Sequence, residues 1–171
     1  MRSKKKIFEL RIEVFPESHK TKWESLDKIH LTLKFVGGIE DNLIDAVADS
    51  LNFVTEFKSL DCEFTKFGFF YDRKEAKILW IGLKIENKVF ELVEKLNILL
   101  QEFSIPAEKR KFVPHLTLKR LKGNEGAEFI RSFENFNVPA VKFKASKIVL
   151  YKSELLQSGS RYSEIKIYNL K

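Results

Sequence analysis

The chain has 171 residues, of which 44% are hydrophobic and 32% charged, and 16 of them are phenylalanines. This composition excludes a disordered chain and supports one compact domain or two small packed lobes. The single cysteine, Cys62, cannot form an internal disulfide, and no Cys/His cluster has zinc-site spacing. No segment approaches the ~18 apolar residues of a membrane helix, so we expect a cytoplasmic protein that does not enter membranes. The net charge of +7 gives weak support to a polyanionic partner such as RNA.

Hydrophobic periodicity predicts strands where apolar and polar residues alternate, and helices where apolar residues recur every three to four positions. Pro16 ends the first predicted strand, Asn87 caps the second helix, Pro106 marks its exit, and Ser158-Gly159-Ser160 forms the last turn. In chain order we expect a strand over 8–15, a strand over 29–36, a helix over 41–57, strands over 60–69 and 77–85 joined by a charged hairpin connection, a helix over 87–103, a strand over 112–121, a short helix over 125–133, and strands over 141–151 and 162–170.

This order of elements indicates an α+β fold with antiparallel sheets, because hairpin connections outnumber long crossovers. The sequence shows no linker between its halves. We therefore expect a single domain over residues 1–171, built from two lobes that share one core.

The most informative feature is the sequence His-Leu-Thr-Leu-Lys, which starts at position 30 and returns at position 115, 85 residues later. On a strand, the histidine and threonine of each copy share one face, while the leucines point to the core. A lone His-x-Thr is usually an ordinary half-buried strand. An identical repeat that holds two of the three histidines favours function; the third, His19, lies in a polar stretch and is expected at the surface. The candidate catalytic residues are His30, Thr32, His115 and Thr117.

Further candidates lie next to the repeat. Strict alternation puts Lys34 and Lys119 on the histidine face, where they supply positive potential or are simply solvated. It puts Arg120 on the leucine face, so Arg120 reaches the histidines only if the strand bends. Phe112 either stacks on a base or packs in the core.

The two His-x-Thr motifs resemble those of the 2H phosphoesterase superfamily, and within it the RNA 2′,3′-cyclic phosphodiesterase family, also called the 2′-5′ RNA ligases. The resemblance extends from about residue 22 to the end of the chain. It is carried by Lys22-Trp23 before the first motif and Phe35-Val36-Gly37 after it, Ile78–Gly82, Phe112-Val113-Pro114 before the second motif and Arg120 after it, and Ser153-Glu154-Leu155 with Gly159 and Tyr162.

The resemblance implies a fold of two pseudo-symmetric lobes, with antiparallel sheets around a central cleft and helices on the outside. Family members usually place a full helix between the first strand and the Lys-Trp segment. Only Pro16 to Thr21 is available here. We therefore expect this first family helix to be missing and one wall of the cleft to be altered.

The implied reaction is hydrolysis of an RNA 2′,3′-cyclic phosphate to a 2′-phosphate. One imidazole removes a proton from water and the other protonates the leaving oxygen, while the threonines donate hydrogen bonds to the phosphate oxygens. We assign His115 as the base and His30 as the acid, with Arg120 as an added phosphate contact by resemblance. No metal or other cofactor is expected. The reverse reaction would give a 2′-5′ linkage.

Two alternatives stay open. The same catalysis could act on small cyclic nucleotides, or the chain could be a non-catalytic RNA- or nucleotide-binding module. Intact histidines and threonines in both copies argue against the second alternative. The expected partners are RNA ends, tRNA fragments among them, or small cyclic nucleotides, and we expect a monomer.

Overall fold

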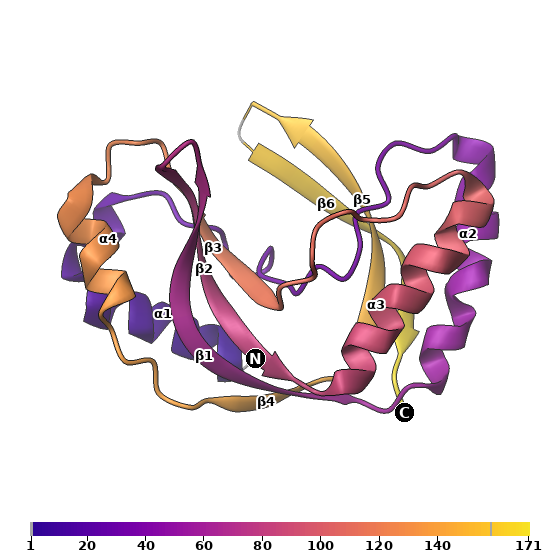
Figure 1. Ribbon diagram of the computed structural model, residues 1–171, viewed down its shortest axis with the longest axis horizontal. Helices are drawn as coiled ribbons and strands as arrows, with labels where there is room; N and C mark the ends of the chain where they lie inside the picture. Colours follow the sequence, from indigo (N-terminus) through magenta and orange to yellow (C-terminus); the bar gives the residue numbers. More distant parts are fainter. Residues whose placement is uncertain (1, 158) are drawn as a thin grey trace. The chain divides into compact units, whose positions relative to one another are not determined.

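The computed structural model describes residues 2–157 and 159–171, without the side chains of residues 2 and 19 (Figure 1). The expectations for His19 and for the middle of the 158–160 turn therefore lie outside the described residues. In chain order the elements, with η for 3-10 helices, are α1 (Arg2–Val14), η1 (Pro16–Lys20), η2 (Asp41–Leu43), α2 (Ile44–Ser50), η3 (Leu51–Glu56), β1 (Leu60–Asp72), β2 (Glu75–Ile85), α3 (Asn87–Leu99), η4 (Leu100–Phe103), β3 (His115–Arg120), α4 (Gly126–Glu134), β4 (Lys142–Ala145), β5 (Lys147–Leu156) and β6 (Gly159–Asn169).

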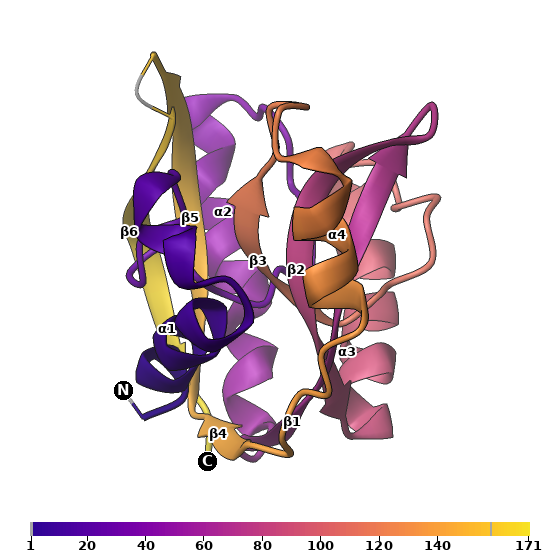
Figure 2. The same cartoon turned by 90° about the vertical axis from the view of Figure 1, so that its left-hand side faces the viewer.

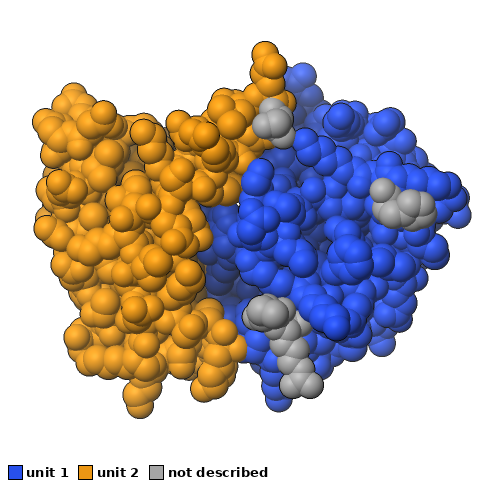
Figure 3. Space-filling view, turned by 180° about the vertical axis from the view of Figure 1, so that it is seen from behind, with its two compact units in different colours: residues 1–32, 62–85, 113–143 blue, residues 33–61, 86–112, 144–171 orange. Residues whose placement is uncertain are grey.

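The chain divides into two compact units, which Figure 3 colours separately. Unit 1 comprises Met1–Thr32, Cys62–Ile85 and Val113–Phe143, and unit 2 comprises Leu33–Asp61, Glu86–Phe112 and Lys144–Lys171. The buried apolar residues form two clusters, each within one unit. That the chain is a single domain whose lobes share one core stays a prediction. The predicted α+β class with antiparallel sheets is confirmed.

Unit 1 is organised by a sheet with the strand order β3-β2-β1-β4, in which β2 pairs antiparallel with both β1 and β3. Helices α1 and α4 cover one face of this sheet (Figure 2). Their contribution to the core includes Leu10 and Phe133, which have no exposed surface. The opposite face, which we call the front face, is not covered by these helices.

The strand predicted over residues 8–15 is wrong, because these residues lie in α1. The segment carries both periodicities, and the helical one prevails. Ile7 and Leu10 are buried in the core of unit 1, whereas Phe8 and Ile12, which a strand would have buried with Leu10, are 41% and 40% exposed. A full helix therefore does precede the Lys22-Trp23 segment, although we expected none.

Most other expected elements are found, with shifted boundaries. β1, β2, β3, β6 and α4 match their predictions, and the strand expected over 141–151 is divided into β4 and β5. The strand expected over 29–36 is reduced to one bridge at Leu31. Asn87 is the first residue of α3 and not its cap, since the N-cap is Glu86. The helix ends at Ser104, whose φ of 59° is left-handed, two residues before Pro106.

Unit 2 contains the β5–β6 hairpin and helices α2 and α3. Its core joins Val47 of α2, Leu92 of α3 and Tyr168 of β6. The Tyr168 hydroxyl donates a 2.6 Å hydrogen bond to the Ala48 carbonyl, and burial raises the pKa of Tyr168 to about 12. Within the part of the chain that the structure describes, no helix is long and apolar enough to cross a membrane.

Candidate active site

The His-Leu-Thr parts of the two repeated motifs, residues 30–32 and 115–117, are neighbours within unit 1. Leu31 forms an antiparallel bridge with Leu116, on the edge of β3 that does not pair with β2. In an antiparallel pair, the residue before one partner lies opposite the residue after the other. His30 therefore lies opposite Thr117, and Thr32 opposite His115. We had expected the two motif strands to lie side by side or to face each other; the bridge places Leu31 of the first motif beside Leu116 of the second.

The Leu31–Leu116 bridge indicates that the four motif side chains share the front face of the sheet. Leu31, Leu116 and Leu118 pack into the core of unit 1, so the intervening histidines and threonines point the other way. His30 and His115 are diagonal neighbours about the Leu31–Leu116 bridge, and diagonal neighbours in an antiparallel pair are typically about 7–8 Å apart, with their Cβ atoms somewhat closer. We had expected the motif leucines to pack against the helices that begin near Asp41 and Asn87. Leu31, Leu116 and Leu118 instead pack in the core that includes α1 and α4, and only Leu33 packs against α2 and α3.

The two imidazoles are held in the same way. Nδ1 of His30 lies 2.7 Å from the Lys28 carbonyl oxygen, and Nδ1 of His115 lies 2.6 Å from the Val113 carbonyl oxygen. A carbonyl can only accept, so each Nδ1 carries the proton of this hydrogen bond. The Nε2 atom of each ring is therefore the one that can take up or release a proton during a reaction.

The surroundings of His30 shift its proton affinity. Burial lowers the pKa of His30 below the ordinary value of 6.5, and the charge of Lys4 acts in the same direction. The hydrogen bond to Lys28 and the charge of Glu24 oppose this shift without cancelling it. At neutral pH the neutral form of His30 is therefore favoured.

We predict that the His30 imidazole titrates below pH 6.5 in the free protein. The check is an NMR titration of the ring resonances, with His30→Gln used to assign the signal. Glu24→Gln should lower the midpoint further, because the Glu24 carboxylate stabilises the imidazolium. Glu17→Gln, which removes an exposed partner of Lys20, is the matched control. A His30 midpoint at or above 6.5 would contradict the prediction.

A β-bulge reverses the facing that we predicted for Arg120 and Lys119. The β2–β3 register is Trp80 with Thr117, then Leu79 with Lys119, so Leu118 is an extra residue on β3. Lys119 consequently shares the core face with Leu79. Arg120, opposite Ile78, shares the front face with the histidines. Strict alternation gave the wrong face for both residues.

Lys119 is a structural residue of the bulge. It is 4% exposed, and its Nζ lies 3.3 Å from Glu125 Oε1 and donates a 3.1 Å hydrogen bond to the Lys22 carbonyl. Burial acts to raise the pKa of Glu125, but hydrogen bonds from the Lys122 backbone N–H and from Lys119 hold it below its usual value. Lys119 therefore cannot serve as the solvated rim charge that we considered from the sequence.

Arg120 is 62% exposed at its side chain, with its Nε 3.5 Å from Glu24 Oε1. The backbone N–H of Glu24 donates a 2.9 Å hydrogen bond to the carbonyl of Leu118, the extra residue of the bulge. The bulge and the 22–24 segment thus fix the place of Arg120 on the front face.

We predict that Lys119→Met lowers the free energy of unfolding by about 3–5 kcal/mol, because it leaves the buried Glu125 carboxylate without its cation. Urea denaturation measures this change. The double variant Lys119→Met/Glu125→Gln should recover most of the loss. The matched control is Lys77→Met, whose pair with Glu75 is 42% and 52% exposed and should contribute about 0–1 kcal/mol. Equal losses for Lys119→Met and Lys77→Met would contradict the structural role.

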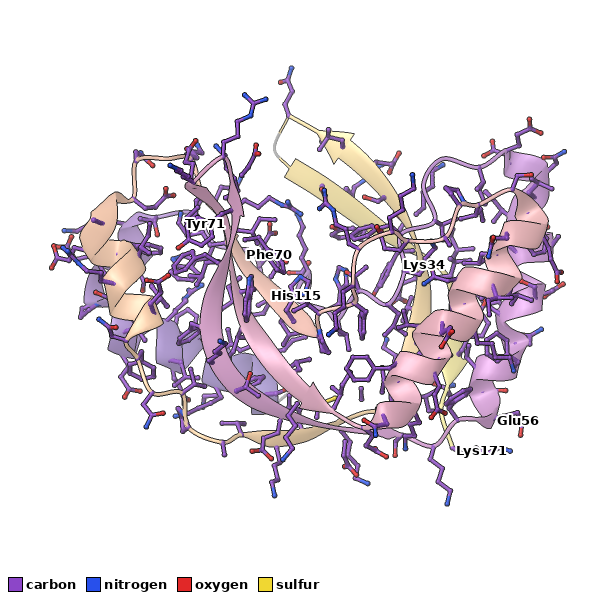
Figure 4. All side chains as sticks on the ribbon, viewed as in Figure 1. Lys34, Glu56, Phe70, Tyr71, His115 and Lys171 are labelled. Carbon is purple, nitrogen blue, oxygen red and sulfur yellow. The ribbon has the colours of Figure 1, made fainter. Side chains whose placement is uncertain are left out.

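Two aromatic residues beside His115 were missed by the sequence reasoning. The Phe70 ring, from β1, lies edge-to-face with the His115 imidazole at a centroid distance of 4.8 Å (Figure 4). The Trp80 ring lies 6.3 Å from the same imidazole. Phe70 and Trp80 both occupy front-face positions by register, so period-two alternation along 67–70 and 78–82 was the signal that could have found them.

The other predicted contacts are in unit 2. There the Lys34 Nζ donates a 2.6 Å hydrogen bond to the Pro106 carbonyl, and Phe112 packs edge-to-face on Phe90 at 5.6 Å. Their contact with a substrate stays a prediction. Over the described ranges 2–157 and 159–171, no group of three His, Cys, Asp or Glu side chains could hold a metal ion.

Comparisons with known proteins agree with this arrangement. The sequence profile of the LigT-like phosphoesterases matches residues 2–80 and 82–162. The RNA 2′,3′-cyclic phosphodiesterase of Thermotoga maritima is 26% identical over 160 residues, which cover 93% of this chain and 84% of that protein. The protein of the same name from Methanocaldococcus jannaschii is 28% identical over 160 residues, covering 91% of this chain and 90% of that one.

Solved structures show the same fold. Escherichia coli LigT complexed with 3′-AMP has a TM-score of 0.73 at 19% identity, covering 98% of this chain and 90% of that chain. The protein TT0787 of Thermus thermophilus has a TM-score of 0.71 at 20% identity, covering 95% of this chain and 92% of that chain. The resemblance that the two motifs indicated is confirmed. The chain belongs to the LigT-like phosphoesterase family.

Proposed function

We propose that this protein is an RNA 2′,3′-cyclic phosphodiesterase that opens the cyclic phosphate at RNA ends to a 2′-phosphate. The observation that best supports the proposal is the Leu31–Leu116 bridge, because alternation on either side of it would bring two histidines and two threonines to one sheet face. The names of the related proteins support the same reaction and the same substrate class.

The proposed reaction uses the two Nε2 atoms as its proton carriers. His115 Nε2 takes a proton from water, whose oxygen attacks the phosphorus. The bond from phosphorus to O3′ breaks, and O3′ takes the proton of His30 Nε2. The attacking and leaving oxygens lie on opposite sides of the phosphorus, and a diagonal pair of an antiparallel sheet, typically about 7–8 Å apart, leaves room for the phosphate between the two rings.

Thr32 and Thr117 are assigned to the non-bridging phosphate oxygens, where their hydroxyls stabilise the charge that builds up. Arg120 adds a cation on the same face, as the bulge places it there. With a 5′-hydroxyl in place of the attacking water, the same steps join that hydroxyl to the phosphorus, break the bond to O3′ and leave a 2′-5′ linkage. Water at high concentration makes this the minor reaction.

The lowered pKa of His30 has a consequence for the pH dependence of this reaction. A general acid must be protonated, so kcat/KM falls as the pH rises through its pKa in the free enzyme. Since the pKa of His30 lies below 6.5, the alkaline decline should begin on the acid side of neutrality. If His30 were the base, kcat/KM would instead fall on the acid side of the same pKa. The His30→Gln profile identifies the limb that belongs to His30.

The decisive assay follows the opening of a 2′,3′-cyclic end on an RNA oligonucleotide and on mononucleotides, with EDTA present. If the net charge of +7 engages the RNA backbone, the oligonucleotide KM should rise steeply with salt, whereas that of the mononucleotides should stay nearly flat. Turnover of mononucleotides alone would assign the enzyme to small cyclic nucleotides. No turnover of either substrate would leave a binding module. A monomeric, cytoplasmic enzyme is part of the same proposal.

A further inference from the structure

Phe70 and Trp80 form one aromatic surface on the front face of unit 1. Their ring centroids lie 5.4 Å apart with planes inclined by 38°, and both rings neighbour His115. Both side chains are only partly buried. The ring surface that remains accessible beside the polar motif residues can be covered by a flat apolar ligand, and removing it from water is favourable.

Two glycines fix the orientation of the indole. A Cβ on Gly68 would lie 2.4 Å from Cη2 and Cζ2 of Trp80, and a Cβ on Gly82 would lie 3.2 Å from its Cζ3. The indole therefore lies flat against the sheet, over one glycine and beside the other. A ring laid flat in this way turns one π-face toward the backbone and the other away from it.

The indole N–H does not take part in recognition. Trp80 Nε1 is buried and has no hydrogen-bond partner within the described residues. A ligand on this surface therefore contacts the faces and edges of the rings and receives no hydrogen bond from the indole N–H. Such contacts favour flat, apolar π-systems without distinguishing their hydrogen-bonding edges.

The position of the surface relates it to the substrate. In a nucleoside 2′,3′-cyclic phosphate the base is separated from the phosphorus by a single ribose ring. A phosphate held at His115 Nε2 therefore brings its own base into the neighbourhood of this imidazole, where the Phe70 centroid lies at 4.8 Å. The aromatic surface is the neighbouring feature of the front face that suits a base.

We propose that Phe70 and Trp80 are the stacking site for the base of the nucleotide that carries the cyclic phosphate. This proposal rests on the proposed function of the histidines. It makes the aromatic pair a determinant of specificity for nucleosides over base-free sugar phosphates. Because every base has a π-face, the site accepts all four bases, in contrast to a site that reads base edges.

The test compares kcat/KM for adenosine 2′,3′-cyclic phosphate with that for the base-free 1-O-methylribose 2′,3′-cyclic phosphate. The wild-type protein should prefer the nucleoside by about 5- to 150-fold, the factor that base stacking supplies. Phe70→Leu should reduce this preference at least about fivefold. Phe70→Tyr, which keeps the ring, should retain the preference.

The matched control is Phe8→Leu, which removes a partly exposed ring from α1, on the covered side of the sheet, and should not change the preference. Equal losses on both substrates in Phe70→Leu would show that Phe70 only positions His115 and would overturn the stacking site. So would a wild-type protein that turns over both substrates equally well, a result that needs no variant to fold. A wild-type protein that opens neither substrate would instead contradict the proposed function.

Discussion

Replacing either His30 or His115 by alanine is expected to lower kcat/KM for opening of a 2′,3′-cyclic phosphate by about 10²–10⁴-fold. Each substitution removes one Nε2, and with it either the acceptor for the proton of water or the donor to O3′. Both Nδ1 atoms are engaged by backbone carbonyls, so no other nitrogen of the remaining histidine can take over the lost role. The measurement is steady-state hydrolysis of a cyclic-ended substrate.

The third histidine provides the control for these variants, because His19 lies outside the repeated motif. His19→Ala should retain wild-type turnover. The double variant His30→Ala/His115→Ala should lose less than the product of the two single losses, since residues that act in one proton-transfer sequence are not additive. Near-wild-type turnover in either single variant would remove the acid–base pair from the proposal.

The shared face of the motif side chains could be predicted from the sequence, because it depends on a local rule. Period-two alternation holds where a segment is extended with its leucines toward the core; Leu116 is buried in β3, and Leu31 is partly buried at the bridge. What the rule could not give is which edges pair. The tertiary fold determines that position 30 lies beside position 117. In the sequence, only the repeated motif indicated that these two segments are neighbours.

The bulge marks the limit of that local rule. One extra residue at Leu118 exchanges the faces of Lys119 and Arg120, and no glycine marks the bulge within the sequence Thr117–Arg120. The buried Glu125 that pairs with Lys119 lies beyond the strand, and its approach depends on the turn that leads into α4. The resemblance indicated Arg120 as a phosphate contact, although alternation placed its side chain on the leucine face. The bulge explains the difference, because it turns Arg120 to the front face.

The prediction of a strand in the N-terminal segment was wrong for a different reason. Residues 7–14 carry apolar side chains that satisfy period two at Phe8, Leu10, Ile12 and Val14, and helical spacing at Ile7, Leu10 and Val14. Sequence alone gives no arbitration between the two patterns. The sheet of unit 1 needs a cover over its core face, and a helix that buries Ile7 and Leu10 provides it.

Removing one motif hydroxyl, by Thr32→Val or Thr117→Val, is expected to lower kcat by about 10²–10³-fold, the usual loss for one donor to a developing oxyanion. Valine keeps the shape of threonine and the β-propensity of the position, so the sheet should be preserved. Thr117 lies opposite His30 and Thr32 opposite His115, which sets each hydroxyl beside the imidazole of the other motif. Both limbs of the pH profile should survive, because the proton carriers are intact.

The matched control for the threonine variants is Thr65→Val. Thr65 is an exposed threonine whose hydroxyl lies beside Gly82 on the front face of the same sheet, but it belongs to neither motif. Its loss should change kcat by no more than about threefold, far below the effect of losing an oxyanion donor. Thr32→Ser and Thr117→Ser, which restore the hydroxyl, should recover most of the activity. If a motif variant loses one limb of the pH profile, that threonine takes part in proton transfer. If the motif variants lose no more kcat than Thr65→Val, neither hydroxyl stabilises the developing charge.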